Sequence, residues 1–308
     1  MTKRPLLYLL LFLAVPLLLG PLLAPWLFLL LKKLSVHSFF SGLADERFER
    51  VTTRAVQIIA LVLVWPCLRG SGTVARVAPA LRFSKARLRS FLYWALIGVA
   101  MIVVIYGVGF AVGNYSLAAK HRGSFTLLTT PLAFIVGAIL IGALEEYLFR
   151  GFIFGSLRSR FSFASAAIVS SAFFSAIHFF RPRLPAPLEE VTWSSGFQLF
   201  PHMFALFVPT RDWDFAITLF FMAIALCALL MRHGHLYGIA GLHAGWVWAL
   251  QSGAALFDQT VRHESFWFGW GDNAAQGALT ALLAIVLAVY TWRIRHPAPR
   301  LDTPAPTP

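Results

Sequence analysis

Two glutamates and an arginine interrupt a long apolar segment near the middle of this chain. Residues 137–154 read GAILIGALEEYLFRGFIF and belong to an apolar run long enough to cross a bilayer. Each charge costs roughly 2.5–3.5 kcal/mol inside a membrane, so intramembrane charges usually have partners and a function. On a helix, Glu146 and Arg150 are four residues apart on one face, which favours an ion pair, and Glu145 points about 100° away. The alternative is a charge cluster that only fixes helix packing.

The composition indicates a polytopic membrane protein. Of its 308 residues, 58% are hydrophobic and 13% are charged, with a mean hydropathy of +0.72; soluble domains carry about 25% charged residues. Cys67 and Cys227 each lie in an apolar run and are expected to be free, buried thiols. The net charge of +13 is interpreted as membrane topology. No nucleic-acid partner is expected, because the basic loops lack the aromatic residues that stack on bases.

We expect an all-α fold with about eight transmembrane helices. The expected spans cover residues 5–31, 55–68, 91–113, 128–157, 161–180, 215–231, 236–256 and 275–292. The first span is expected to be retained rather than cleaved and to be kinked by its three prolines. Between the first two spans we expect a polar loop over residues 32–54, and after the last span a Pro-rich, disordered tail.

The loops also predict an orientation and a division of the chain. Basic residues far outnumber acids at the N-terminus, in the even-numbered loops and in the tail, whereas the odd-numbered loops hold both signs in near balance. We therefore expect a multi-pass protein of the cell membrane with both termini in the cytoplasm and lipid as a partner. The expected regions are N-terminal helices with basic loops over 1–120, a catalytic core over 121–258, and a last helix with the tail over 259–308.

Two further spans each carry a histidine. His178 lies in FFSAIHFF and His243 in GIAGLHAGWVW. Either alone is more often a core residue, but titratable groups from three spans together are typical of a shared intramembrane site. One free carboxylate with two imidazoles favours general-base catalysis on water, with Glu145 as the base. If each span is centred in the bilayer, His243 lies about 5 Å from Glu145 toward the cytoplasmic side, and His178 lies about 10 Å from Glu145 toward the outside. Packing of the helices must therefore bring the three residues together.

Three motifs then resemble those of one family. EEYLFR matches EExxxR, Phe174 to His178 matches FxxxH, and His243 to Val247 matches HxxxB, in the family's order. The chain resembles the CPBP family, which includes CAAX prenyl endopeptidases, bacteriocin-processing and immunity proteins, and other prokaryotic relatives. The resemblance covers about residues 128–256. It implies an intramembrane endopeptidase with an eight-helix core and a conical site reached from the cytoplasmic side.

The resemblance also implies roles for individual residues. Glu145 would be the general base supported by Glu146 and Arg150, His178 would help to bind the water, and His243 would stabilise the oxyanion. One position departs from the pattern: the last motif residue is often Asn or Asp, and here it is Val247. Gln251, one turn further along, or Trp246 or Trp248 beside it, could supply the missing donor.

Several alternatives stay open from the sequence. The expected enzyme needs no cofactor, and its substrate is a membrane-associated protein or peptide. A zinc peptidase with Glu145, His178 and His243 as ligands is the minor alternative, since the chain lacks an H-E-x-x-H pair. A rival from another class is a non-catalytic immunity or scaffold protein, or a proton-coupled transporter that uses the same cluster as a relay.

Overall fold

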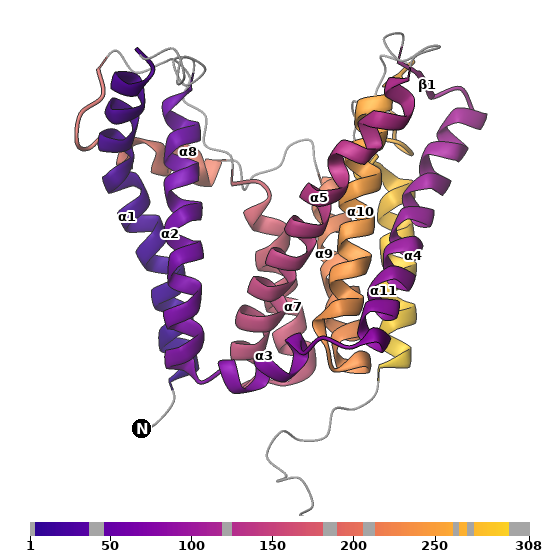
Figure 1. Ribbon diagram of the computed structural model, residues 1–308, viewed down its shortest axis with the longest axis horizontal. Helices are drawn as coiled ribbons and strands as arrows, with labels where there is room; N and C mark the ends of the chain where they lie inside the picture. Colours follow the sequence, from indigo (N-terminus) through magenta and orange to yellow (C-terminus); the bar gives the residue numbers. More distant parts are fainter. Residues whose placement is uncertain are drawn as a thin grey trace, which may run out of the picture. The chain divides into compact units, whose positions relative to one another are not determined.

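The computed structural model describes residues 4–36, 46–118, 125–180, 190–205, 213–260, 265–269 and 274–295. Within these ranges the fold is helical, and each of the eight expected spans coincides with a helix (Figure 1). The predicted all-α polytopic fold is therefore confirmed. The Pro-rich tail beyond residue 295, Asp45 in the first loop, and residues 181–189 and 206–212 of the long loop after residue 180 lie outside the described residues.

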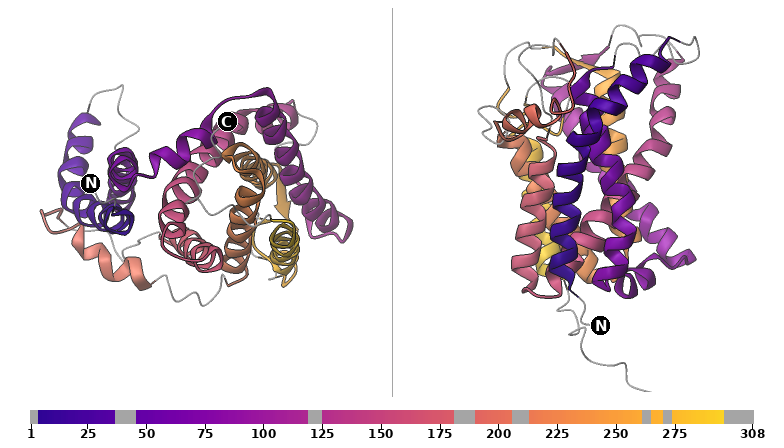
Figure 2. Two further views of the ribbon diagram at one scale, coloured as in Figure 1. Left: turned by 90° about the horizontal axis from the view of Figure 1, so that it is seen from below. Right: turned by 90° about the vertical axis from the view of Figure 1, so that its left-hand side faces the viewer.

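The chain divides into two compact units, Met1–Val74 with Ala176–Arg211, and Ala75–Ser175 with Asp212–Pro308. In the first unit, helices α1 and α2 run side by side (Figures 1 and 2). The bounds are α1 Pro5–Leu34, α2 Phe48–Ser71, the 3-10 turn η4 Phe197–Leu199 and α8 Phe200–Ala205. Helix α1 continues through Pro16, Pro21 and Pro25, all of which are buried.

Helix α2 begins before the residue that the hydropathy indicated, so the prediction of a polar loop up to Arg54 was wrong. The residues from Phe48 onward are helical although they are polar. Glu49 lies in the first turn, where a negative charge is favourable, and the Thr52 hydroxyl donates to the carbonyl oxygen of Phe48 at 3.0 Å. The helix ends where Gly72 adopts a left-handed conformation with φ of 72°.

The second unit contains the glutamates and His243. Its helices are α3 Val74–Leu81, α4 Lys85–Ala111, α5 Thr126–Glu146, the π-helix η3 Tyr147–Phe154, α6 Gly155–Arg158, α7 Phe163–Ile177, α9 Trp213–His233, α10 Leu236–Leu256 and α11 Ala278–Ile294. The last two residues of α7 cluster with the first unit. Two short strands, β1 Tyr115–Leu117 and β2 Phe257–Gln259, pair antiparallel next to the ends of α4 and α10.

Among the described residues, five helices are long and apolar enough to span a membrane: α1, α2, α4, the continuous α5–η3–α6 helix, and α9. Helices α7 and α11 are apolar but shorter. Helix α10 has 21 residues, among them His243 and Gln251, and is not one of these five. Helix α10 is instead the packing centre of its unit and lies against α4, α5 and α9 (Figure 1).

Close backbone approach explains how α10 is held between α4 and α5. A Cβ atom at Gly241 would lie 2.1 Å from the Phe91 carbonyl oxygen of α4, and one at Gly245 would lie 2.2 Å from that of Ala95. On the α5 side, a Cβ atom at Gly142 would lie 2.8 Å from the backbone nitrogen of Ala244. Such small residues are what lets helices pack closely in lipid.

This packing predicts that Gly241→Ala destabilises the protein. The added methyl group has no room against the α4 backbone, and overpacking of this kind costs about 1–3 kcal/mol. We expect a lower melting temperature for detergent-purified protein. Gly137→Ala is the matched control, because nothing lies within 4 Å of a Cβ atom there. Equal melting temperatures for the two variants would contradict the proposed packing.

Candidate active site

The two adjacent glutamates are the last residues of α5, and the arginine lies one turn further in η3. The buried residues of α5 are Ala138, Gly142 and Glu146, spaced four apart, so Glu146 belongs to the narrow stripe that packs inward. Its Oε1 atom accepts a hydrogen bond of 2.9 Å from Nη1 of Arg150. The predicted ion pair is therefore present, and it is buried, with side-chain exposures of 0% and 2%.

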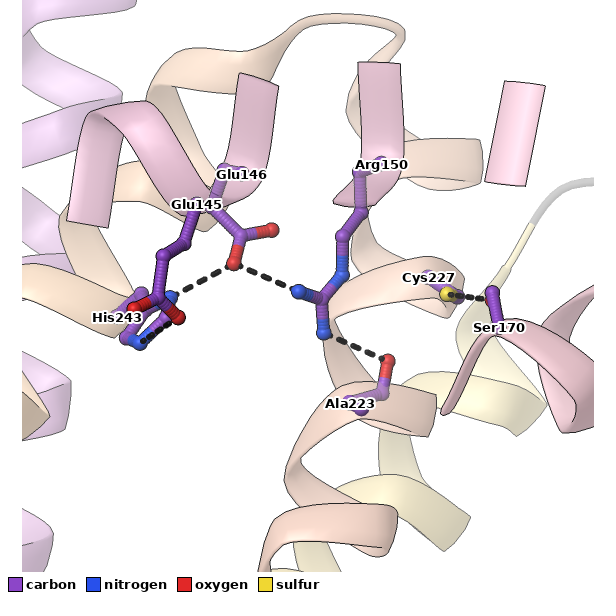
Figure 3. Close-up of polar contacts among 7 residues, drawn as sticks. All are labelled: Glu145, Glu146, Arg150, Ser170, Ala223, Cys227 and His243. Atoms are coloured by element: carbon purple, nitrogen blue, oxygen red, sulfur yellow. Dashed lines mark hydrogen bonds and ion pairs between the residues drawn. The ribbon is translucent and has the colours of Figure 1, made fainter. Parts of the chain in front are cut away.

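Helix α10 brings His243 to both glutamates (Figure 3). Its Nδ1 atom lies 2.7 Å from the same Oε1 atom of Glu146 that binds Arg150. Its Nε2 atom lies 3.8 Å from Oε2 of Glu145, which is within ion-pair range but too long for a hydrogen bond. Because a carboxylate paired with arginine can only accept, Nδ1 of His243 is the donor to Glu146. That bond fixes the ring and turns Nε2 toward Glu145.

Arg150 is held by three further contacts besides Glu146. Its Nη2 atom donates to the carbonyl oxygen of Ala223 in α9 at 3.4 Å (Figure 3). The guanidinium carbon lies 4.6 Å from the ring centroid of Phe174 in α7 and 6.0 Å from that of Phe149. The Phe174 ring also meets the His243 ring edge-on, with centroids 6.0 Å apart. Arg150 is thus clamped between a carboxylate, a carbonyl and two aromatic faces.

The glutamates retain unused hydrogen-bonding capacity. The Oε2 atoms of Glu145 and Glu146 are both buried without a hydrogen-bond partner among the described residues. The Glu145 side chain as a whole is 32% exposed, whereas that of Glu146 is fully buried. Unsatisfied buried carboxylate oxygens are rare in proteins, and at a site such as this they fit a bound water or substrate group. Of the two carboxylate side chains, that of Glu145 is the more exposed.

The other predicted site residues are distributed as follows. His178 lies in the turn after α7, partly exposed, in the first unit, so its part in the site stays a prediction. Val247 and Gln251 are partly exposed on α10. The Trp248 indole donates to the carbonyl oxygen of Pro131 in α5 at 2.8 Å. Trp246 is buried, and its ring centroid is 6.5 Å from that of His243.

Two features of the site were missed in the sequence. The first is the π-helix over Tyr147–Phe154, where the sequence indicated a regular helix; wide turns of this type are frequent at functional sites. The second is the carbonyl of Ala223, since a backbone acceptor has no sequence signal. Cys67 and Cys227 are both free and buried, as expected. The Cys227 sulfur lies 3.7 Å from the Ser170 hydroxyl (Figure 3).

The polar site also bears on metal binding. Over the part of the chain that the structure describes, no group of three His, Cys, Asp or Glu side chains is placed to hold a metal ion. His243 directs Nδ1 to Glu146, which leaves Nε2 as its free ring nitrogen.

The fold and this site define a polytopic helical membrane protein with an intramembrane cluster of two glutamates, a histidine and an arginine. Residues 127–249 match the family model described as Type II CAAX prenyl endopeptidase Rce1-like. No curated protein and no solved structure gives a significant match. The matched residues carry all three motifs, so the comparison confirms the resemblance over this part of the chain. At the level of the family, this indicates a CAAX-protease-like membrane peptidase with a membrane-associated protein substrate.

Proposed function

We propose that this protein is an intramembrane endopeptidase that uses Glu145 to activate the attacking water. The observation that carries the proposal is the chain of contacts from Arg150 through Glu146 to His243, with Glu145 beside the other ring nitrogen of His243. Oε1 of Glu146 accepts from both Arg150 and His243, and the Glu146 side chain is fully buried, whereas the Glu145 side chain is 32% exposed. This difference between adjacent carboxylates gives them separate roles, with Glu145 as the base and Glu146 as the positioning residue.

The proposed reaction is a direct hydrolysis. Glu145 accepts a proton from water as the water oxygen attacks the carbonyl carbon of the scissile peptide bond. The tetrahedral intermediate carries its negative charge on the former carbonyl oxygen. When the intermediate collapses, the carbon–nitrogen bond breaks and Glu145 returns the proton to the leaving nitrogen. The products are a carboxylate and an amine.

His243 is proposed to stabilise the oxyanion. Its Nδ1–H group donates to Glu146, so a second proton on Nε2 makes that atom a donor toward the developing negative charge. With a protonated His243, the charges of Glu145, Glu146, Arg150 and His243 sum to zero. His178 is proposed to help bind the water, as the family motif implies.

Comparison of protein termini in cell membranes tests this proposal. Membranes that contain the wild-type protein are compared with membranes that contain Glu145→Gln, and new N-termini are identified by mass spectrometry. We expect at least one cleavage in a membrane-associated protein to disappear in the variant. If the termini are identical and the variant still supports the cellular phenotype that depends on the wild-type protein, a scaffold or immunity role replaces the peptidase. A phenotype that is lost without any change in termini favours the proton-coupled transporter.

A chelator separates the glutamate mechanism from the zinc alternative. The purified protein is assayed on an internally quenched, farnesylated peptide with a CaaX C-terminus, a probe chosen from the family's description. We expect hydrolysis to be unaffected by 1,10-phenanthroline. Loss of hydrolysis that added zinc restores would assign the metal mechanism instead.

The orientation in the membrane is also a proposal, with both termini and the loop before α4 in the cytoplasm. Lys85 at the start of α4 and Asp258 in β2 are both exposed, and the two native cysteines are buried, so single cysteines can be introduced at low background. A membrane-impermeant maleimide added to intact cells is expected to label Asp258→Cys and not Lys85→Cys. The reverse labelling pattern would invert the orientation.

A further inference from the structure

An unused indole N–H group lies beside His243. We infer that Trp246 is a second oxyanion donor of the peptidase, in place of the polar residue that Val247 lacks. The inference rests on the proposed function and extends it by one catalytic group. The oxyanion of a tetrahedral intermediate can accept more than one hydrogen bond, so a second donor can act on it together with His243.

The burial of Trp246 is the first argument. Its side chain is 2% exposed, and its Nε1 atom is buried without a hydrogen-bond partner among the described residues. Buried tryptophan N–H groups usually find an acceptor, and leaving one unpaired costs about 1–3 kcal/mol. An unpaired indole N–H group beside the proposed active site is available to donate to an acceptor atom of the substrate.

The position of Trp246 on α10 is the second argument. It follows His243 by three residues, a spacing that puts both side chains on the same side of a helix, and their ring centroids lie 6.5 Å apart. The other sides of α10 are taken by backbone contacts of Gly241 and Gly245 with α4, and of Ala244 with α5. His243 and Trp246 therefore lie on one side of α10, away from the positions of Gly241, Ala244 and Gly245.

The other residues near the last motif position are less suitable as the second oxyanion donor. The Trp248 indole is already bound to the carbonyl oxygen of Pro131 at 2.8 Å. Val247 has no side-chain donor. Gln251 is partly exposed and lies two helical turns from His243, about 12 Å along the helix axis. Of the residues around the last motif position, Trp246 combines burial, an unpartnered donor and proximity to His243.

The test is removal of the N–H group with the aromatic ring retained. For Trp246→Phe, assayed on the farnesylated CaaX peptide, we expect kcat to fall by about 10²–10³-fold, as for other single oxyanion donors. KM is expected to stay within about threefold, since the bond forms only in the transition state. A phosphinate analogue of the same peptide, which presents a tetrahedral anionic centre, is expected to bind more weakly by a similar factor.

Three matched variants make this test specific. Trp248→Phe removes an indole that serves α5 packing, so it is expected to lower the melting temperature and to leave kcat unchanged. Gln251→Ala is expected to keep wild-type turnover. Val247→Asn introduced together with Trp246→Phe is expected to recover part of the lost kcat, because it restores a side-chain donor at the family's motif position. If Trp246→Phe does not fold, 3-benzothienylalanine at position 246 keeps the ring shape and lacks the N–H group.

Each outcome has a defined meaning. Wild-type kcat for the protein without the position-246 N–H group overturns the inference, and so does a loss that appears only in KM. A 10²-fold loss in Gln251→Ala assigns the donor to Gln251 instead. The proposed function is tested separately by Glu145→Gln. If this variant still hydrolyses the peptide, the proposed function fails, whatever the result at position 246.

Discussion

Glu145→Gln is expected to lower kcat for peptide hydrolysis by about 10²–10⁴-fold, the contribution typical of a general base. The substitution keeps the shape of the side chain, but an amide cannot take a proton from water at neutral pH. KM is expected to change little, because the proposed proton transfer to Glu145 takes place only in the transition state. The measurement is steady-state hydrolysis of the farnesylated CaaX peptide by purified protein in detergent or nanodiscs.

The stability of this variant is part of the same prediction. The Glu145 side chain is 32% exposed and makes no hydrogen bond to His243 across the 3.8 Å gap. We therefore expect a melting temperature close to that of the wild type. Glu190→Gln, the same chemical change at an exposed position outside the cluster, is expected to leave both kcat and melting temperature unchanged. Wild-type hydrolysis by Glu145→Gln would contradict the proposed glutamate mechanism.

Breaking the buried pair of Glu146 and Arg150 is expected to have the largest effect on stability. Glu146→Leu leaves a buried guanidinium without its carboxylate, and Arg150→Met leaves a buried carboxylate without its arginine. Removing one partner of a buried pair costs about 3–5 kcal/mol. Each single variant is expected to unfold at a markedly lower temperature. Each is also expected to lose hydrolysis, because Glu146 orients His243 and Arg150 holds the same carboxylate oxygen of Glu146.

The double variant separates stability from catalysis. Glu146→Leu with Arg150→Met replaces both charges by apolar side chains, which is often neutral for folding. We expect its melting temperature to recover most of what either single variant loses, so that the coupling energy in the double-mutant cycle is large. Hydrolysis is expected to stay low, since His243 has lost its acceptor. Additive losses of stability would show that the pair is not a coupled unit, and restored hydrolysis would show that Glu146 does not position His243.

Much of the fold and part of the site are readable from local sequence patterns. The apolar runs predict the helices because a segment in lipid must satisfy its own backbone hydrogen bonds. The four-residue spacing of Glu146 and Arg150 predicts their ion pair, since both lie on one helical face. Polar helix starts are harder to predict, as α2 shows: its first turn is stabilised by Glu49 and by hydroxyl-to-backbone bonds rather than by hydropathy.

By itself, the sequence determined the helices, the family motifs and the pairing of two residues within one turn. Only the tertiary structure decided that His243 bridges the two glutamates, that Ala223 and Phe174 clamp Arg150, and that Trp246 rather than Trp248 keeps an unpartnered indole. The physical reason is the range of the interactions. Contacts within a helix follow from its period, whereas contacts between helices depend on which small residues, such as Gly142 and Gly241, let the backbones approach.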